Sequence, residues 1–296
     1  MSTIEQALAK KLAERESQHS EEKQPDNSAE VSGIHKEQVI TSTESTANNY
    51  FEIDTQKLSN NDFIIQDIED SKQTLIAEFR QIKRKLLNNA FGAVAKTLQN
   101  PNLIMITSPK ANEGKTFIAL NLALSIAQEQ DKTVLLIDAD VLRPSVLNEC
   151  GVKSKPGLIE YLLNDSKDIR DIIYHTNIDN LKIIPAGTPH HLSNELLASE
   201  RMAKLAQELS SRYPDRVVIF DSPPLLGISE TSVLAQLMGQ ALIAVEENRT
   251  SLHDVQQASA LLHDELAKGL VLNKAFHAQK ELYGYYGYGY GKRTPQ

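Results

Sequence analysis

Three consecutive residues, Gly114, Lys115 and Thr116, are of the types that hold a polyphosphate. They follow a short apolar run at 103–106 and precede a stretch in which apolar residues recur at helical spacing. A strand, a polar loop and a helix in this order point successive backbone N–H groups and the positive end of the helix at one place. The sequence therefore predicts a P-loop, with Lys115 reaching the β- and γ-phosphates of a bound polyphosphate and the Thr116 hydroxyl ligating Mg²⁺.

The loop departs from the common pattern G-x-x-x-x-G-K-[ST] at one position. Pro109 stands where that pattern has its first glycine. Asparagine tolerates a positive φ, so Asn112 is expected to share the tight turn with Gly114. The alternative is an ordinary surface turn with an incidental lysine, and the carboxylates that follow two other strands count against it.

Two further apolar runs end in carboxylates. The run at 132–137 is followed by Asp138 and Asp140, and the run at 216–220 by Asp221. Continuous apolar runs of this length are typical of buried parallel strands, and α/β sheets bind ligands outside the carboxyl ends of such strands. Each aspartate alone could equally be a helix cap or a turn residue. Three carboxylates at one edge repel each other unless a cation is present, and Mg²⁺ with nucleotide phosphates supplies one.

The rest of the chain alternates between strand and helix patterns. We expect strands at 181–184, 240–245 and 269–272, and helices at 74–89, 194–210 and 251–266. This alternation predicts an α/β fold, with a mainly parallel P-loop NTPase sheet flanked by helices and joined by right-handed crossovers.

Composition divides the chain into three parts. Residues 1–62 are expected to be an acidic, mostly disordered N-terminal segment, because 16–61 is rich in charged and polar residues and poor in apolar ones. Residues 63–275 are expected to form the P-loop domain, and residues 276–296 a flexible tail rich in tyrosine and glycine.

Charge and cysteine content narrow the class of protein. Residues 1–70 hold 15 acidic and 6 basic residues, whereas the remainder holds 24 and 25, so no basic face for nucleic acid is expected. The single cysteine, Cys150, excludes a disulfide framework within the chain and fits a reducing compartment. No run of 18 apolar residues and no signal-peptide pattern is present. We therefore expect a cytoplasmic protein.

The tail holds five of the nine tyrosines. They are Tyr283, Tyr285, Tyr286, Tyr288 and Tyr290. Alternating glycine and tyrosine is also what a simple low-complexity segment would show. If the last strand is parallel, however, the tail leaves it after Asn273 at the same sheet edge as the phosphate site. Ten residues span on the order of 33 Å when extended, so these tyrosines can reach an active site, either their own or a neighbour's.

These motifs together resemble the bacterial tyrosine kinases of exopolysaccharide biosynthesis. The resemblance rests on the P-loop, Asp-x-Asp-x-x-Arg at 138–143, Asp-Ser-Pro-Pro at 221–224 and the terminal tyrosine cluster, and it covers roughly residues 70–291. More narrowly, the segments 78–84, 112–117 and 195–201 look like those of the cytoplasmic, exosortase-associated autokinases.

The resemblance implies a set of roles. It implies ATP binding by Asn112, Glu113, Gly114, Lys115, Thr116, Phe117 and Asn273, and catalysis by Lys115, Asp138, Asp140 and Asp221. We assign Thr116 as a direct Mg²⁺ ligand, and Asp140 and Asp221 to the metal's water shell. Because the tyrosine hydroxyl has a pKa of about 10, its proton must leave during transfer, and Asp138 is our candidate to orient that hydroxyl and accept the proton.

The resemblance also implies partners. It implies autophosphorylation of the tail tyrosines in trans within a homo-oligomer, a phosphotyrosine phosphatase, and a membrane polysaccharide chain-length (copolymerase) protein that recruits the kinase to the inner membrane. Glu78 and Arg80 are expected either to pair across a subunit interface or to lie on a solvated helix face.

Two other functions stay open on the sequence alone. One is a switch ATPase of the septum-positioning or plasmid-partition type, because Lys110 matches the place of the intersubunit lysine in that class of P-loop. The other is a nucleotide-binding regulator of polysaccharide export without enzymatic activity.

Overall fold

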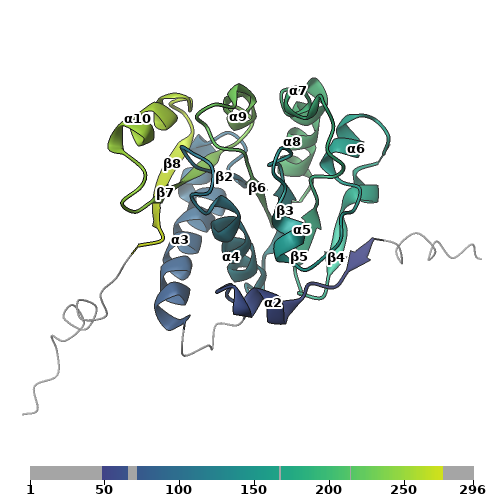
Figure 1. Ribbon diagram of the computed structural model, residues 1–296, viewed down its shortest axis with the longest axis horizontal. Coiled ribbons are helices and arrows are strands. Elements are labelled where there is room, and N and C mark those ends of the chain that lie inside the picture. The colour runs from purple at the N-terminus through teal and green to yellow at the C-terminus, as the bar shows by residue number, and fades with distance from the viewer. Residues whose placement is uncertain (1–48, 66–71, 167, 214, 276–296) are drawn as a thin grey trace, which may run out of the picture. The chain divides into compact units, whose positions relative to one another are not determined.

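A computed structural model describes residues 49–65, 72–166, 168–213 and 215–275. The five tail tyrosines that we expect to accept phosphate lie outside these ranges, as do residues 1–48 of the predicted N-terminal segment. Figure 1 shows the described residues as helices on both faces of one sheet.

The described residues form an eight-stranded sheet in the order β1-β4-β5-β3-β6-β2-β7-β8. Every neighbouring pair is parallel except β4 and β5, which are antiparallel. The strands are β1 (Tyr50–Phe51), β2 (Leu103–Thr107), β3 (Thr133–Asp138), β4 (Tyr174–Thr176), β5 (Leu181–Ile184), β6 (Arg216–Asp221), β7 (Gln240–Glu246) and β8 (Ala267–Asn273). The predicted α/β fold with a mainly parallel, helix-flanked sheet is confirmed.

Helices cover both faces of this sheet (Figure 1). The helices are α2 (Thr55–Asn60), α3 (Gln73–Phe91), α4 (Lys115–Ala127), α5 (Val146–Glu149), α6 (Leu158–Leu162), α7 (Ser193–Leu197), α8 (Glu200–Arg212), α9 (Ser229–Ala235) and α10 (Leu252–Ala260), with 3₁₀ turns η2 (Ala93–Thr97) and η3 (Ile169–Ile172).

Alternation along the central strands divides the core into two layers. In β2, Ile104 and Ile106 pack in the layer with α3 and α4, whereas Leu103 and Met105 pack in the opposite layer with α8 and α9. Successive side chains of a strand point to opposite faces, so a central strand covered on both sides must be apolar throughout. This burial fixes the carboxyl ends of β2, β3 and β6 at one edge.

The expectation of disorder over residues 16–61 is wrong for residues 49–61. Here β1 pairs with β4, and α2 starts at an Asp54 cap whose side chain accepts the Lys57 N–H. Ile53 and Leu58 are at most 2% exposed. Phe51, Ile53 and Leu58 of this stretch are buried in the core and Tyr50 is exposed, so three apolar side chains anchor a segment whose average composition is polar.

Two predicted helices have different bounds in the structure. The helix expected at 194–210 is two helices, α7 and α8, because Ser199 leaves the helical conformation and its hydroxyl accepts the Met202 N–H at 3.2 Å. The helix expected at 251–266 ends at Ala260, and the chain continues in turns to β8. The predicted strand at 181–184 is confirmed as β5.

Candidate active site

The loop between β2 and α4 has the backbone conformation that was predicted for it. Asn112 has a φ of 66° and Gly114 a φ of 91°, so these two residues share the turn. A Cβ on Gly114 would lie 1.9 Å from Nδ2 of Asn273, which explains why glycine stands there. No side chain caps α4 at Gly114. The first N–H groups of α4 are therefore available to an anion.

The start of the loop is held by the segment that follows β6. The Thr107 hydroxyl donates to the Pro223 carbonyl at 2.8 Å, and the Leu225 N–H donates to the Ser108 carbonyl at 2.8 Å. The Leu226 N–H reaches the Pro109 carbonyl at 3.1 Å. Because the positive φ values fall at Asn112 and Gly114, position 109 needs no glycine and only its carbonyl is used.

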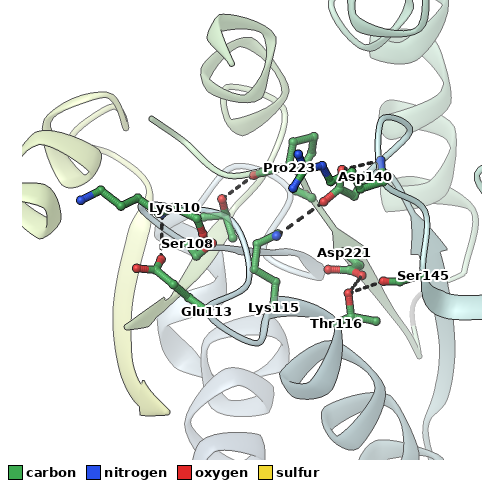
Figure 2. A network of polar contacts seen from close by, with 12 residues as sticks. Ser108, Lys110, Glu113, Lys115, Thr116, Asp140, Ser145, Asp221 and Pro223 are labelled. Atoms are coloured by element: carbon green, nitrogen blue, oxygen red, sulfur yellow. Dashed lines mark hydrogen bonds and ion pairs between the residues drawn. The ribbon is translucent and has the colours of Figure 1, made fainter. Parts of the chain in front are cut away.

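The buried side chain of Glu113 holds the middle of the P-loop through hydrogen bonds. Its side chain is 1% exposed and accepts the Lys110 N–H at 2.8 Å and the Thr250 hydroxyl. Figure 2 shows this carboxylate turned towards Lys110. The Glu113 carboxylate is therefore engaged within the protein, and only its backbone N–H is left for the nucleotide contact expected of this residue.

Lys110 is tied to α10. Its ammonium group lies 2.6 Å from Oδ2 of Asp254. The hydrogen bond from Lys110, and a second from Ser251, lower the pKa of Asp254 to about 2. In this structure Lys110 is thus engaged within its own chain.

Figure 2 shows Lys115, Thr116, Asp140 and Asp221 together at the carboxyl edge of the sheet, and the pairing of β3 with β6 brings Asp138 to the same edge. Asp138 and Asp221 are register partners at the ends of β3 and β6. The Thr116 hydroxyl donates to Oδ2 of Asp221 at 2.6 Å, and Nζ of Lys115 lies 3.5 Å from Oδ2 of Asp140. The sheet thus brings together side chains separated by up to about a hundred residues of sequence.

Sequence reasoning missed Ser145. Its hydroxyl lies 2.7 Å from Oγ1 of Thr116, and its N–H donates to Oδ2 of Asp138 at 3.1 Å. The Val146 N–H donates to the same oxygen at 3.1 Å. The available signal was its place directly after Pro144 and just before a short helix, a position that serine often takes.

Burial controls the ionisation of the two strand-end carboxyls. It raises the pKa of Asp221 to about 7, and the Thr116 hydrogen bond and the Lys115 charge hold it from rising further. Burial, followed by the charge of Asp221, raises the pKa of Asp138 well above its ordinary value. Oδ1 of each carboxyl is buried and finds no hydrogen-bond partner among the described residues. A positive charge at the site would therefore favour the ionised form of both carboxyl groups.

The donor set fits Mg²⁺. Within the described ranges, no cluster of three or more His, Cys, Asp or Glu residues could hold a metal by itself. Mg²⁺ typically takes one or two carboxylates and completes its shell with water and phosphate oxygens. The unpartnered Asp221 oxygen beside the Thr116 hydroxyl matches this requirement.

A cavity of about 700 Å³ opens over the loop. The P-loop lines one wall, and Leu142, Arg143 and the segment 224–228 line the others. Its volume suits a nucleotide-sized ligand. Asn273, expected to bind nucleotide, lines instead a second groove of about 970 Å³ between α3 and β8, and Phe117 lines both. Gly114 also lines both, and Asn273 contacts the P-loop from the side of the second groove.

Helices long and apolar enough to cross a bilayer are absent from the described part of the chain.

Comparison with known proteins places the chain among P-loop proteins. A family model described as an AAA domain (AAA_31) matches residues 101–271, a range that contains the P-loop and all three aspartates. The tyrosine-protein kinase YwqD of Bacillus subtilis is 31% identical over 202 residues, which are 68% of this chain and 82% of YwqD. The putative tyrosine-protein kinase EpsB of Ralstonia solanacearum is 33% identical over 194 residues, 65% of this chain. That match covers only 24% of EpsB, so the chain spans about a quarter of such longer relatives.

Two solved structures share the fold. The chimerical protein CapA2B2 is 26% identical with a TM-score of 0.60, over 70% of this chain and 88% of that one. The kinase domain of the Escherichia coli tyrosine kinase ETK is 29% identical with a TM-score of 0.52, over 64% of this chain and 73% of that one.

Proposed function

The chain belongs to the AAA_31 family of P-loop domains and, within it, to the bacterial tyrosine-protein kinases, and from this membership we propose that it is an ATP-dependent protein-tyrosine autokinase. The observation that carries the proposal is the similarity to YwqD, which extends over 82% of a protein named as a tyrosine-protein kinase. The clustering of Lys115, Thr116 and the strand-end aspartates supports it independently.

The site residues divide the work of phosphoryl transfer. The transition state of this reaction is loose, so positioning and charge neutralisation matter more than a strong base. Lys115, held beside Asp140, and the open N–H groups at the start of α4 receive the transferred phosphoryl group. Mg²⁺, held by Thr116 with Asp140 and Asp221, would neutralise phosphate charge.

Asp138 is proposed to orient the acceptor hydroxyl and take its proton. The Ser145 and Val146 N–H groups fix one of its oxygens at 3.1 Å each. The other oxygen has no partner among the described residues. In its ionised form, a carboxyl with a raised pKa is a stronger base than an ordinary one, and a cation at the site would favour that ionised form.

The proposed acceptors are the tail tyrosines at positions 283, 285, 286, 288 and 290. Support comes from where the described chain ends. β8 finishes at Asn273, whose amide donates to the Glu113 carbonyl of the P-loop at 2.9 Å. The end of β8 therefore lies against the P-loop, and about ten residues separate Asn273 from the first tail tyrosine, enough for the tail to reach its own active site or a neighbour's. We propose transfer between subunits of a homo-oligomer.

The cellular role is a further part of the proposal. We propose a cytoplasmic kinase that a polysaccharide chain-length protein recruits to the inner membrane. A phosphotyrosine phosphatase removes the phosphate from its tyrosines, and the kinase regulates exopolysaccharide synthesis and export. The motifs shared with the exopolysaccharide kinases support this role.

One experiment separates the proposed kinase from the alternatives. The purified protein is incubated with ATP and Mg²⁺, and phosphotyrosine is measured by mass spectrometry, with Lys115→Met as control. Phosphotyrosine on the wild-type protein alone supports the kinase. ATP hydrolysis without phosphotyrosine would favour a switch ATPase. Nucleotide binding with neither activity would favour a regulator.

A further inference from the structure

Two consecutive carbonyl groups of the P-loop are held by side chains from the end of β8. Nζ of Lys274 donates to the Asn112 carbonyl at 2.8 Å. Nδ2 of Asn273 donates to the Glu113 carbonyl at 2.9 Å. Both carbonyls therefore face β8, on the side of the loop away from the 700 Å³ cavity.

Because the peptide bond is planar, these contacts also fix the direction of the two N–H groups that follow the carbonyls. In a trans peptide, the C=O of one residue and the N–H of the next point in opposite directions. Holding the carbonyls of Asn112 and Glu113 towards β8 therefore points the N–H groups of Glu113 and Gly114 away from it. Neither N–H donates to an acceptor within the described part of the chain. Successive N–H groups that face one way form an anion-binding concavity.

Lys274 is itself fixed. Its Nζ lies 3.0 Å from Oε2 of Glu246 at the end of β7, and Arg249 contacts the same carboxylate oxygen at 3.0 Å. Half-exposed ion pairs of this kind add little to folding stability. The ion pair instead orients Lys274, because Glu246 holds the ammonium group at the place from which it donates to the Asn112 carbonyl. It also favours the left-handed conformation of Asn112, which a residue other than glycine rarely adopts.

We propose that Lys274, anchored by Glu246, is a positioning residue for phosphate binding. It fixes the peptide between Asn112 and Glu113, so that the Glu113 N–H is directed at a nucleotide phosphate before the nucleotide arrives. The inference rests on the proposed function in that the bound anion is a nucleotide phosphate. Preorganised N–H donors bind more tightly than free ones, since no rotation has to be frozen on binding.

The test compares substitutions at Lys274 in the full chain. Mg–ADP binding is measured by titration calorimetry, and folding by thermal denaturation. Lys274→Met should bind Mg–ADP about tenfold more weakly, the size of effect expected for one hydrogen bond from a charged donor, with an unchanged melting temperature. Lys274→Arg keeps a charged donor and should restore most of the affinity. Lys268→Met removes a lysine of β8 whose ammonium group contacts the Leu262 carbonyl and Asp264 and not the P-loop, and it should bind like the wild type.

Two further readouts identify what the lysine acts on. Adenosine, which carries no phosphate, should bind Lys274→Met and the wild type alike in competition with a fluorescent nucleotide. In autophosphorylation, Lys274→Met should raise KM for ATP and leave kcat nearly unchanged, because the contact orients the loop equally before and during transfer.

Several results would overturn the proposal. Equal Mg–ADP affinity of Lys274→Met and wild type would show that the contact does not orient the loop. An equal loss of affinity for adenosine and for Mg–ADP would show that Lys274 affects binding of the nucleoside and not of the phosphates. A wild-type protein that binds no Mg–ADP would overturn the proposed function itself, and the role of Lys274 with it.

Discussion

Replacing Gly114 with alanine tests the geometry of the P-loop most sharply. The residue has a φ of 91°, and a Cβ built on it would lie 1.9 Å from Nδ2 of Asn273. The substitution therefore combines two separable penalties. One is backbone strain at a left-handed residue. The other is displacement of the Asn273 amide from the Glu113 carbonyl.

The two penalties can be estimated. A residue with a Cβ in the left-handed conformation lowers the free energy of unfolding by roughly 1–2 kcal/mol relative to glycine. Displacing Asn273 loses one neutral hydrogen bond of about 1 kcal/mol, and the steric shift adds a similar amount. Gly114→Ala should therefore lower the free energy of unfolding by roughly 3–4 kcal/mol.

The chain supplies a matched control for the strain. Gly227 has a φ of 98°, and a Cβ built on it meets nothing within 4 Å. Gly227→Ala should show the strain alone, at roughly 1–2 kcal/mol. Urea denaturation gives both values, and the double variant Gly114→Ala, Asn273→Ala should recover the steric part. If Gly114→Ala loses no more stability than Gly227→Ala, the close approach of Asn273 to Gly114 is wrong.

Three further predictions concern the active site and the fold. Lys115→Met should stay folded and lose autophosphorylation by at least about a hundredfold, because a charge aimed at the phosphates is gone; wild-type phosphotyrosine on the folded variant would contradict the P-loop assignment. Leu58→Ala should lower the free energy of unfolding by roughly 2–5 kcal/mol, since Leu58 is fully buried in α2; a change near zero would show that residues 49–61 do not belong to the core. Asp254 should titrate by NMR with a pKa of about 2, and Lys110→Met should move it towards 3.8. Because the folded pKa lies below the unfolded one, this ion pair contributes stability above pH 4 that is lost as the pH falls towards 2, and the Lys110→Met variant should show a smaller loss over that window.

The parts of the site that the sequence predicted are those with local signals. The strand, the turn at Asn112 and Gly114 and the start of α4 follow one another along the chain, so residue type and spacing suffice to predict them. The aspartates at the ends of β3 and β6 were also predictable, because parallel strands bring their carboxyl ends to one edge.

The hydrogen bonds that hold the P-loop in place were not predictable, because they join residues far apart in the sequence. The Glu113 carboxylate meets Thr250 across 137 positions, and the Asn112 carbonyl meets Lys274 across 162. No spacing rule connects such pairs before the fold is known. The short strands β1 and β4 were missed for a related reason, since two or three residues carry too little periodicity to indicate a strand.

The central claim is transfer of phosphate to tail tyrosines between subunits, and mixing two complementary variants tests it most directly. One variant carries Lys115→Met and an intact tail. The other keeps the catalytic residues and has phenylalanine at positions 283, 285, 286, 288 and 290. Each variant alone should form almost no phosphotyrosine with ATP and Mg²⁺, and the mixture should place phosphate on the tail of the Lys115→Met protein. A mixture of folded, assembled variants in which that tail stays unphosphorylated would contradict the claim.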